Sequence, residues 1–276
     1  DWDEYYRQTE RKNQHQEKAN YLLDNKKVYE SEGALWFKIP HGESVIVEDL
    51  VLGKVEYETD DLKDFVIRRS DGTFTYNFAC AVDDADLEIS HVMRGDDHLN
   101  NTPKQLLLYE ALDIDPPKFA HFPMILGEDH KRLSKRHGAT SVLSYKKKGI
   151  LPEALTNFLA RLGWSHGNQE IFSRDELIDY FSLDDVGESS AVFDEEKLLW
   201  LNHEWMKRKD PEELGRLFRD FLIGTEGATK EQLDSLGDSR LTELASQLRE
   251  RNRTLVQMAE SGEFVFTEDL DYASTS

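Results

Sequence analysis

A short basic segment has the residue types that bind a polyphosphate. It reads Lys131-Arg132-Leu133-Ser134-Lys135-Arg136-His137-Gly138. Residues 131–150 hold seven lysines and arginines and no acid, whereas the whole chain has 34 basic and 55 acidic residues and a net charge of -21. Serine, lysine and arginine hold phosphate oxygens through charge-assisted hydrogen bonds. Because charge alone does not identify a ligand, a solvated basic loop stays open as the alternative at this point.

Two loops that suit a nucleotide follow two predicted strands. Residues 88–93 and 119–126 predict strands, and residues 103–112 between them predict a helix. Strand, helix and strand in this order indicate a βαβ unit with a parallel sheet. Ligands of such sheets bind at the carboxyl ends of the strands. The segment Arg94-Gly95-Asp96-Asp97-His98 follows the first strand and the basic segment follows the second, so we expect both loops to converge on one nucleotide site.

The chain before this unit predicts a helix and then short strands. Residues 5–25 are polar and compatible with a helix. Residues 31–62 predict a small β-rich unit, with strands at 34–39, 45–47 and 54–57 separated by turn residues. A further strand is expected at residues 65–67.

Beyond residue 150 the pattern becomes helical. A helix is predicted from apolar residues at helical spacing, namely Leu151, Ala154, Leu155, Phe158, Leu159 and Leu162. Ser173 and Glu176 are spaced as a capping box that opens a second helix, and Asp194 is placed to cap a third. Residues 210–260 predict further amphipathic, charge-rich helices.

Composition narrows the class of protein. No run of about 18 apolar residues occurs, so no membrane span is expected, and the charged start predicts no signal peptide. Cys80 is the only cysteine, which excludes a disulfide within these residues, argues against a cysteine-based zinc site and favours a reducing compartment. The pI near 4.8 argues against indiscriminate nucleic-acid binding, but it is compatible with a local RNA-binding face.

One polar cluster resembles a metal site only superficially. Its members are Asp83, Asp84, Asp86, His91, Asp96, Asp97 and His98. Carboxylates and imidazoles at irregular spacing are a weak signal for a metal, so we predict no metal ligands in the chain.

Ordered motifs along the chain resemble those of the bacterial-type glutamyl-tRNA synthetases, which are class I aminoacyl-tRNA synthetases. The motifs are YRQTER (6–11), DFVIRRSDG (64–72), TYNFA (75–79), HVMRGDDHLNNTPKQ (91–105), KRLSKRHGA (131–139), LGWSHG (162–167) and LWLNH (199–203). The resemblance runs almost continuously from Tyr5 to about Trp205 and then weakens. Several motifs in family order are far more specific than the basic segment alone.

The resemblance implies an α/β fold class and four regions. Residues 1–62 would be a shortened connective, acceptor-binding insertion. Residues 63–139 would be the second half of a class I Rossmann-type nucleotide-binding fold. Residues 140–205 would form an all-α stem-contact domain, and residues 206–276 the start of a helical anticodon-binding domain.

The resemblance also implies an ATP site. It matches Arg132, Leu133, Ser134, Lys135 and Arg136 to the KMSKS-type loop, which closes over the ATP triphosphate. Lys135 would be the catalytic residue, stabilising negative charge while a carboxylate attacks the α-phosphate. Arg132 stands where the motif has its first lysine. Asp97 and His98 match positions that border the adenosine, and an exposed loop residue is the alternative for His98.

Tyr76 and Arg94 match the amino-acid pocket of the family. A guanidinium pairs bidentately with a carboxylate, so Arg94 would bind the side chain of glutamate. Two alternatives stay open, a structural ion pair of Arg94 with Asp83, Asp84, Asp96 or Asp97, and a core position for Tyr76. Cys80 is interpreted as a small buried hydrophobic residue.

The implied activity is that of a glutamate–tRNA ligase. ATP would be a substrate, accompanied by Mg²⁺, and no zinc is expected. The implied partners are L-glutamate and tRNA(Glu), with tRNA(Gln) as a second candidate that the sequence does not decide. A monomer in the cytoplasm, without membrane attachment, is expected. The lysines at 146–148 face tRNA phosphates or form a solvated helix end.

Three departures from the family pattern indicate a truncated form. The HIGH-type motif is absent, the insertion between Tyr29 and Ala34 is short, and only the start of the anticodon-binding region is covered. Half of the catalytic crevice would then be missing, so we expect no aminoacylation from a chain of 276 residues. Glutamate-dependent pyrophosphate exchange by the purified chain would refute this expectation.

Three other functions are compatible with parts of the sequence. A non-catalytic, RNA-binding synthetase paralogue is the main alternative. The intact residues 132–136 and the pocket residues Tyr76 and Arg94 argue against loss of the catalytic site. A glutaminyl-tRNA synthetase is disfavoured because it carries β-barrels where residues 210–260 predict helices. A glutamyl-queuosine relative lacks an anticodon-binding domain, which also disagrees with those helices.

Overall fold

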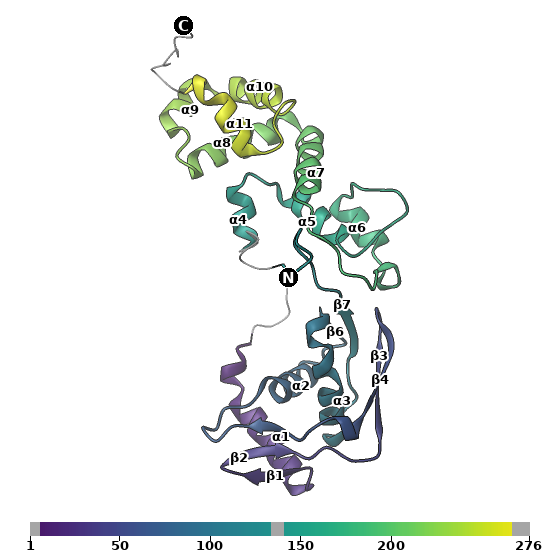
Figure 1. Ribbon diagram of the computed structural model, residues 1–276. Helices are drawn as coiled ribbons and strands as arrows, with labels where there is room; N and C mark the ends of the chain where they lie inside the picture. The colour runs from purple at the N-terminus through teal and green to yellow at the C-terminus, as the bar shows by residue number, and fades with distance from the viewer. Residues whose placement is uncertain (1–5, 134–140, 267–276) are drawn as a thin grey trace. The chain divides into compact units, whose positions relative to one another are not determined.

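The chain forms two compact units of mixed α/β and α-helical structure (Figure 1). The computed structural model describes residues 6–133 and 141–266. The amino-terminal unit comprises Asp1–Met124 with Val186–Glu188, and the carboxy-terminal unit comprises Ile125–Asp185 with Ser189–Ser276. Within the described residues, no helix has both the length and the apolar character needed to cross a membrane.

A four-stranded mixed sheet organises the amino-terminal unit. Its order is β4-β3-β7-β6. Strands β6 (His91–Gly95) and β7 (Lys118–Phe122) are parallel, and helix α3 (Thr102–Ala111) connects them, which confirms the predicted βαβ unit. Strand β3 (Ser44–Asp49) pairs in parallel with β7 and forms an antiparallel hairpin with β4 (Gly53–Glu58).

The strands expected within residues 31–62 divide between two sheets. Strands β1 (Val28–Ser31), β2 (Ala34–Phe37) and β5 (Phe65–Arg68) form a separate antiparallel sheet in the order β1-β2-β5. Strand β3 instead joins the βαβ sheet, because its alternate residues Val45, Val47 and Asp49 are buried on one face. These strands therefore do not pair only with one another, as the sequence had indicated.

Two strand boundaries differ from the prediction, each for a local reason. The strand expected at 88–93 begins at His91, because Glu88 adopts a left-handed conformation with φ of 53° and ends the preceding turn. The strand expected at 119–126 ends at Phe122, because Pro123 follows and has no N–H with which to continue the ladder.

Helices α1 (Lys12–Asp24) and α2 (Tyr76–Asp86) are joined by a buried ion-pair cluster. Arg11 Nε lies 2.7 Å and His15 Nε2 lies 2.8 Å from Asp83 Oδ1. A second nitrogen of Arg11, Nη2, lies 2.8 Å from Asp86 Oδ2. Because α2 carries Tyr76 and Cys80, this cluster helps fix the helix that carries part of the candidate site.

The carboxy-terminal unit is helical. Its helices are α4 (Val142–Lys147), α5 (Pro152–Arg161), α6 (Arg174–Tyr180), α7 (Glu195–Arg208), α8 (Pro211–Gly224), α9 (Lys230–Leu236), α10 (Asp238–Leu248) and α11 (Leu255–Gly262). The capping box of Ser173 and Glu176 and the Asp194 cap are both confirmed. The helix predicted from the apolar stripe forms as α5, in which Leu155 and Phe158 are buried and Leu159 is 44% exposed.

We expect the helical core to be sensitive to substitution of Asn202. Its side chain is fully buried, accepts a hydrogen bond from the Leu151 N–H (2.8 Å), and donates to the carbonyls of Gly149 (3.3 Å) and Arg253 (2.6 Å). Asn202→Leu keeps the branched shape of the side chain but leaves the Leu151 N–H and the Arg253 carbonyl without their side-chain partner. The Gly149 carbonyl keeps its hydrogen bond from the Leu255 N–H. The free energy of unfolding should fall by about 2–4 kcal/mol, measured by urea denaturation followed by circular dichroism.

Asn168→Leu is the matched control, because Asn168 is exposed in the same unit. It should change the free energy of unfolding by no more than about 0.5 kcal/mol. Equal effects of the two substitutions would show that the buried hydrogen bonds of Asn202 contribute nothing specific.

Candidate functional site

Arg94 lies at the carboxyl end of β6, and neutral acceptors hold its guanidinium. Its Nε donates to His121 Nε2 (3.1 Å), and its Nη2 donates to Thr102 Oγ1 (2.9 Å) and Gln105 Oε1 (2.8 Å). The Nη2 group also lies 3.5 Å from the carbonyl oxygen of His98. None of these four acceptors carries a negative charge, so the positive charge of Arg94 is held in position without being neutralised by them.

Two of the aspartates proposed as alternative partners of Arg94, Asp83 and Asp84, make no hydrogen bond to its guanidinium among the contacts of the described residues. Asp83 pairs with Arg11 and His15. Burial, followed by the charge of Asp83, raises the pKa of Asp84, while Arg94 acts in the opposite direction. Arg94 donates its hydrogen bonds to uncharged groups. This arrangement fits a guanidinium that binds an anionic ligand better than a guanidinium in a structural ion pair.

Tyr76 stands beside Arg94 at the first turn of α2. Its side chain is 46% exposed, so the alternative of a core aromatic is wrong. Its ring centroid lies 5.4 Å from that of His98. Burial raises the pKa of the Tyr76 hydroxyl, the neighbouring Cys80 raises it further, and Arg94 lowers it. The structure therefore brings Tyr76, Arg94 and His98 together, and Cys80 lies beside them.

Cys80 is half-buried on α2. Burial and then the charge of Asp84 raise the pKa of its thiol, whereas hydrogen bonds from Gln8 and Tyr76 lower it. Because the thiolate is the reactive form, this raised pKa agrees with the interpretation of Cys80 as a small packing residue rather than a nucleophile.

The loop after β6 is a short 3₁₀ helix, Asp96–Asn101, that carries Asp97 and His98. His98 Nδ1 accepts a hydrogen bond from Asn101 Nδ2 (3.2 Å). A Cβ atom placed on Gly95 would lie 2.7 Å from Asp97 Oδ1. Any side chain at position 95 would therefore displace the Asp97 carboxylate from its observed position.

Asp49 and His121 belong to the same network, and the sequence analysis missed both. Both side chains are completely buried, with Asp49 Oδ2 2.6 Å from His121 Nδ1. Asp49 Oδ1 also accepts hydrogen bonds from the backbone N–H groups of Val51, Leu52 and His121. The available signal was a polar residue that continues the apolar face of each strand, Asp49 after Val45 and Val47, and His121 after Phe119, which calls for a buried partner.

The pKa values of this pair follow from burial and hydrogen bonding. Burial alone would raise the pKa of Asp49, but hydrogen bonds from the Leu52 N–H, the His121 ring and other backbone N–H groups outweigh it and lower the pKa. Burial lowers the pKa of His121, although Asp49 acts in the opposite direction. A carboxylate beside a neutral imidazole is therefore the favoured state at neutral pH.

The basic segment begins as the return arm of a hairpin-like turn in the carboxy-terminal unit. Arg132 bridges Leu126, and the N–H of Leu133 donates to the Ile125 carbonyl (2.8 Å). Ser134, Lys135 and Arg136 lie outside the described residues. Since Arg94 belongs to the amino-terminal unit, the expected convergence of the two loops on one crevice stays a prediction.

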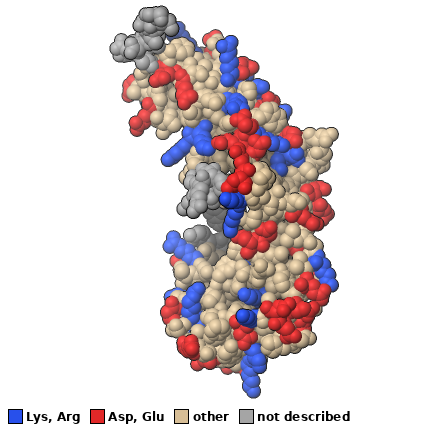
Figure 2. Space-filling model, viewed as in Figure 1, with Lys and Arg blue, Asp and Glu red and all other residues tan. Residues whose placement is uncertain are grey.

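Charged residues are widely spread outside this segment. Figure 2 shows acidic and basic side chains interspersed over the face in view. Lys148, at the end of α4, lies 2.9 Å from Glu195, whereas Lys146 and Lys147 occupy the last turn of the helix. Within the described residues, no group of three or more His, Cys, Asp or Glu side chains is arranged to hold a metal ion.

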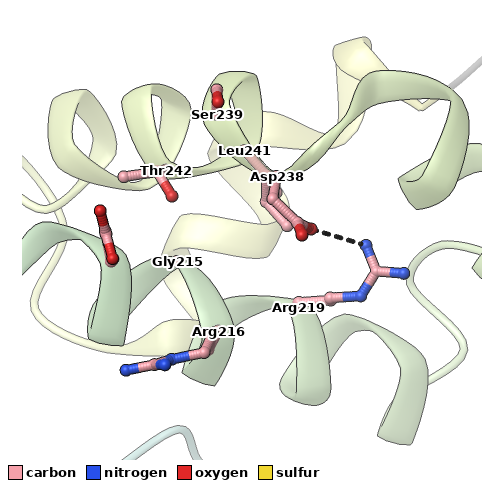
Figure 3. A pocket seen from close by; sticks show the side chains of 8 residues that line it. Gly215, Arg216, Arg219, Asp238, Ser239, Leu241 and Thr242 are labelled. Carbon is pink, nitrogen blue, oxygen red and sulfur yellow. Dashed lines mark hydrogen bonds and ion pairs between the residues drawn. The ribbon is translucent and has the colours of Figure 1, made fainter.

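A cavity of about 430 Å³ opens between α8 and α10 (Figure 3). Arg219 on α8 forms ion pairs with Asp234 and with Asp238, which lies 3.4 Å away. The helices approach closely at Gly215, where an added Cβ would lie 2.7 Å from Thr242 Oγ1. The polar lining thus includes the Arg219–Asp238 ion pair, which joins α8 to α10, and it does not include the residues of the predicted site.

Comparison with known proteins identifies a family and several relatives of this chain. A family model for class I tRNA synthetases (E and Q), catalytic domain, matches residues 2–200. A glutamate–tRNA ligase of Thermodesulfovibrio yellowstonii is 53% identical over 239 residues, which are 87% of this chain and 50% of that protein. One of Geobacter sulfurreducens is 48% identical over 236 residues, or 86% of this chain and 49% of that protein. The chain spans about half the length of the curated relatives it matches.

Solved structures match over most of the chain. The crystal structure of a glutamate tRNA ligase from Elizabethkingia meningosepticum, described as in complex with its amino acid, has a TM-score of 0.79 and 26% identity, covering 99% of this chain and 67% of that one. A glutamate-tRNA synthetase from Elizabethkingia anophelis has a TM-score of 0.72 and 31% identity, covering 93% and 54%. The predicted α/β fold class, with a Rossmann-type half followed by helices, is confirmed.

Proposed function

The chain belongs to the family of class I tRNA synthetases (E and Q) through their catalytic domain, and on this premise we propose that it is part of a glutamate–tRNA ligase. The proposed reaction has two steps. The α-carboxylate of L-glutamate attacks the α-phosphorus of ATP, pyrophosphate leaves, and glutamyl-adenylate forms. A ribose hydroxyl of the tRNA then attacks the glutamyl carbonyl, and AMP leaves.

The observation that carries this proposal within the structure is the setting of Arg94. Its guanidinium is held by neutral acceptors at a strand end, beside the exposed Tyr76. A positioned guanidinium whose hydrogen bonds go to uncharged acceptors suits the side-chain carboxylate of glutamate and disfavours the neutral amide of glutamine. We assign Arg94 and Tyr76 to the amino-acid pocket.

We propose that ATP is bound by Asp97 and His98 together with the segment Arg132, Leu133, Ser134, Lys135 and Arg136. In this assignment the segment contacts the triphosphate, and Lys135 stabilises the charge that develops during adenylation. Mg²⁺ would arrive with ATP, held in part by its phosphates. The protein would mainly position the reactants and neutralise charge.

Further parts of the proposal concern regions and partners. Residues 1–62 would contact the acceptor end of the tRNA, 63–139 would form the second half of the catalytic domain, 140–205 would contact the stem, and 206–276 would begin the anticodon-binding domain. We propose tRNA(Glu) as the RNA substrate, with tRNA(Gln) as a second candidate, and a cytoplasmic monomer as the working form.

Glutamate-dependent ATP–pyrophosphate exchange and aminoacylation by the full-length gene product, both measured with tRNA present, test the proposal. We expect both activities with glutamate, and a much lower exchange with glutamine. The isolated 276-residue chain should show neither activity. Tight tRNA binding by the full-length protein without either activity would support the non-catalytic paralogue and overturn the proposed ligase.

A further inference from the structure

The buried Asp49–His121 pair contacts Arg94 through His121, so it can affect the candidate pocket as well as the stability of the fold. Burying a carboxylate and an imidazole is costly unless each finds complete hydrogen bonding. Asp49 is on β3, His121 is on the adjacent β7, and Arg94 is on β6, the next strand. The three side chains thus form a line across the sheet, with Arg94 at the end that holds the candidate pocket.

The hydrogen-bond partners of His121 determine its tautomer. Asp49, as a carboxylate, only accepts hydrogen bonds, so His121 Nδ1, which lies 2.6 Å from it, must carry the proton. Arg94 Nε only donates, so His121 Nε2, 3.1 Å away, must accept. His121 is therefore a neutral imidazole with its hydrogen on Nδ1.

Thr102 completes the arrangement. Its Oγ1 accepts from Arg94 Nη2 (2.9 Å) and lies 3.1 Å from His121 Nε2, so its own hydrogen can point to that nitrogen. Thr102, like His121, is fully buried. The opposite tautomer would place an Nε2–H against the N–H of Arg94, which would push the guanidinium away from its present position.

We propose that Asp49 and His121 are positioning residues for Arg94: Asp49 fixes the tautomer of His121, and His121 fixes the orientation of the guanidinium for a carboxylate ligand. This inference rests on the proposed function, because the ligand in question is the side chain of glutamate. Neither residue touches the substrate. Their effect is to hold Arg94 in one orientation before glutamate binds, which removes an ordering cost from binding.

Two histidine substitutions separate positioning from packing. His121→Asn places its amide near the former Nδ1, so it still donates to Asp49 but leaves Arg94 Nε without its acceptor. His121→Gln places an amide oxygen near the former Nε2, so it still accepts from Arg94. Asp49→Asn gives His121 an amide donor at Nδ1 and therefore favours the wrong tautomer.

The measurement is the steady-state rate of ATP–pyrophosphate exchange by the full-length protein, with separate KM values for glutamate and ATP. In His121→Asn and Asp49→Asn the KM for glutamate should rise about ten- to a hundredfold, the range for losing a hydrogen bond to a charged group, while the KM for ATP changes little. His121→Gln should recover most of the loss. Thr59→Val is the control, because Thr59 is equally buried but bonds only the backbone of Glu43.

Nitrogen-15 NMR of the histidine side chains tests the same inference without any turnover. We expect His121 to be neutral with its hydrogen on Nδ1, and the Arg94 Nε–H to be protected from exchange in wild type and exposed in His121→Asn. An Nε2–H tautomer in the wild type would overturn the inference. So would folded His121→Asn and Asp49→Asn variants whose KM for glutamate stays within about twofold of wild type. A wild-type protein without any ATP–pyrophosphate exchange activity would instead refute the proposed function. The NMR result would still show whether His121 positions Arg94.

Discussion

Arg94→Ala is expected to lower kcat/KM for glutamate about a thousandfold in the full-length protein, which is roughly 4 kcal/mol of lost stabilisation. The substitution removes a positive charge that the structure holds with uncharged acceptors at a strand end. A glutamate side chain bound there would have no charged partner. The desolvation penalty of its carboxylate would then no longer be offset. The loss should appear mainly in the KM for glutamate, because the side-chain carboxylate does not change charge during the reaction.

Two further variants make this prediction sharper. Arg94→Lys keeps the charge but lacks the planar guanidinium fork that pairs bidentately with a carboxylate, so it should recover only part of the loss. Arg69→Ala is the control, because Arg69 is exposed and bonds only with Thr73 and its turn. If Arg94→Ala bound glutamate as well as wild type in the same exchange assay, the assignment of the amino-acid pocket would be abandoned.

Local patterns in the sequence predicted the elements that carry Arg94. The apolar run at 119–122 and the helix beginning near Pro103 are local signals, and β6, α3 and β7 form as expected. Helix starts were also predictable, because Ser173 and Asp194 bond to backbone groups only three residues away. In each case the residues that determine the structure lie within one or two turns of one another.

The interactions that complete the site could not be predicted in this way, because they join distant parts of the chain. Asp49 and His121 are 72 residues apart, and their contact depends on the parallel pairing of β3 with β7. The sequence shows that β3 has one apolar face, but not which sheet receives that face. The partners of Arg94 were missed for the same reason, since His121 is 27 residues away along the chain.

Lys135→Ala should lower the rate of adenylate formation by about a hundred- to a thousandfold in the full-length protein. The residue lies outside the described residues, and its place in the family motif and its charge are the grounds for this expectation. As the carboxylate attacks the α-phosphorus, negative charge builds up on the phosphate oxygens and on the departing pyrophosphate. A lysine that meets this charge only in the transition state stabilises the transition state more than bound ATP.

The pattern of kinetic constants distinguishes this role from that of Arg94. Lys135→Ala should reduce kcat and leave the KM for glutamate nearly unchanged, whereas Arg94→Ala should act mainly on that KM. Lys54→Ala, at an exposed site on β4 away from Arg94, serves as the control. Single-turnover formation of glutamyl-adenylate isolates the chemical step from tRNA charging. A Lys135→Ala protein with wild-type single-turnover rates would remove the catalytic assignment, and it would leave the basic segment with no more than a binding role for ATP.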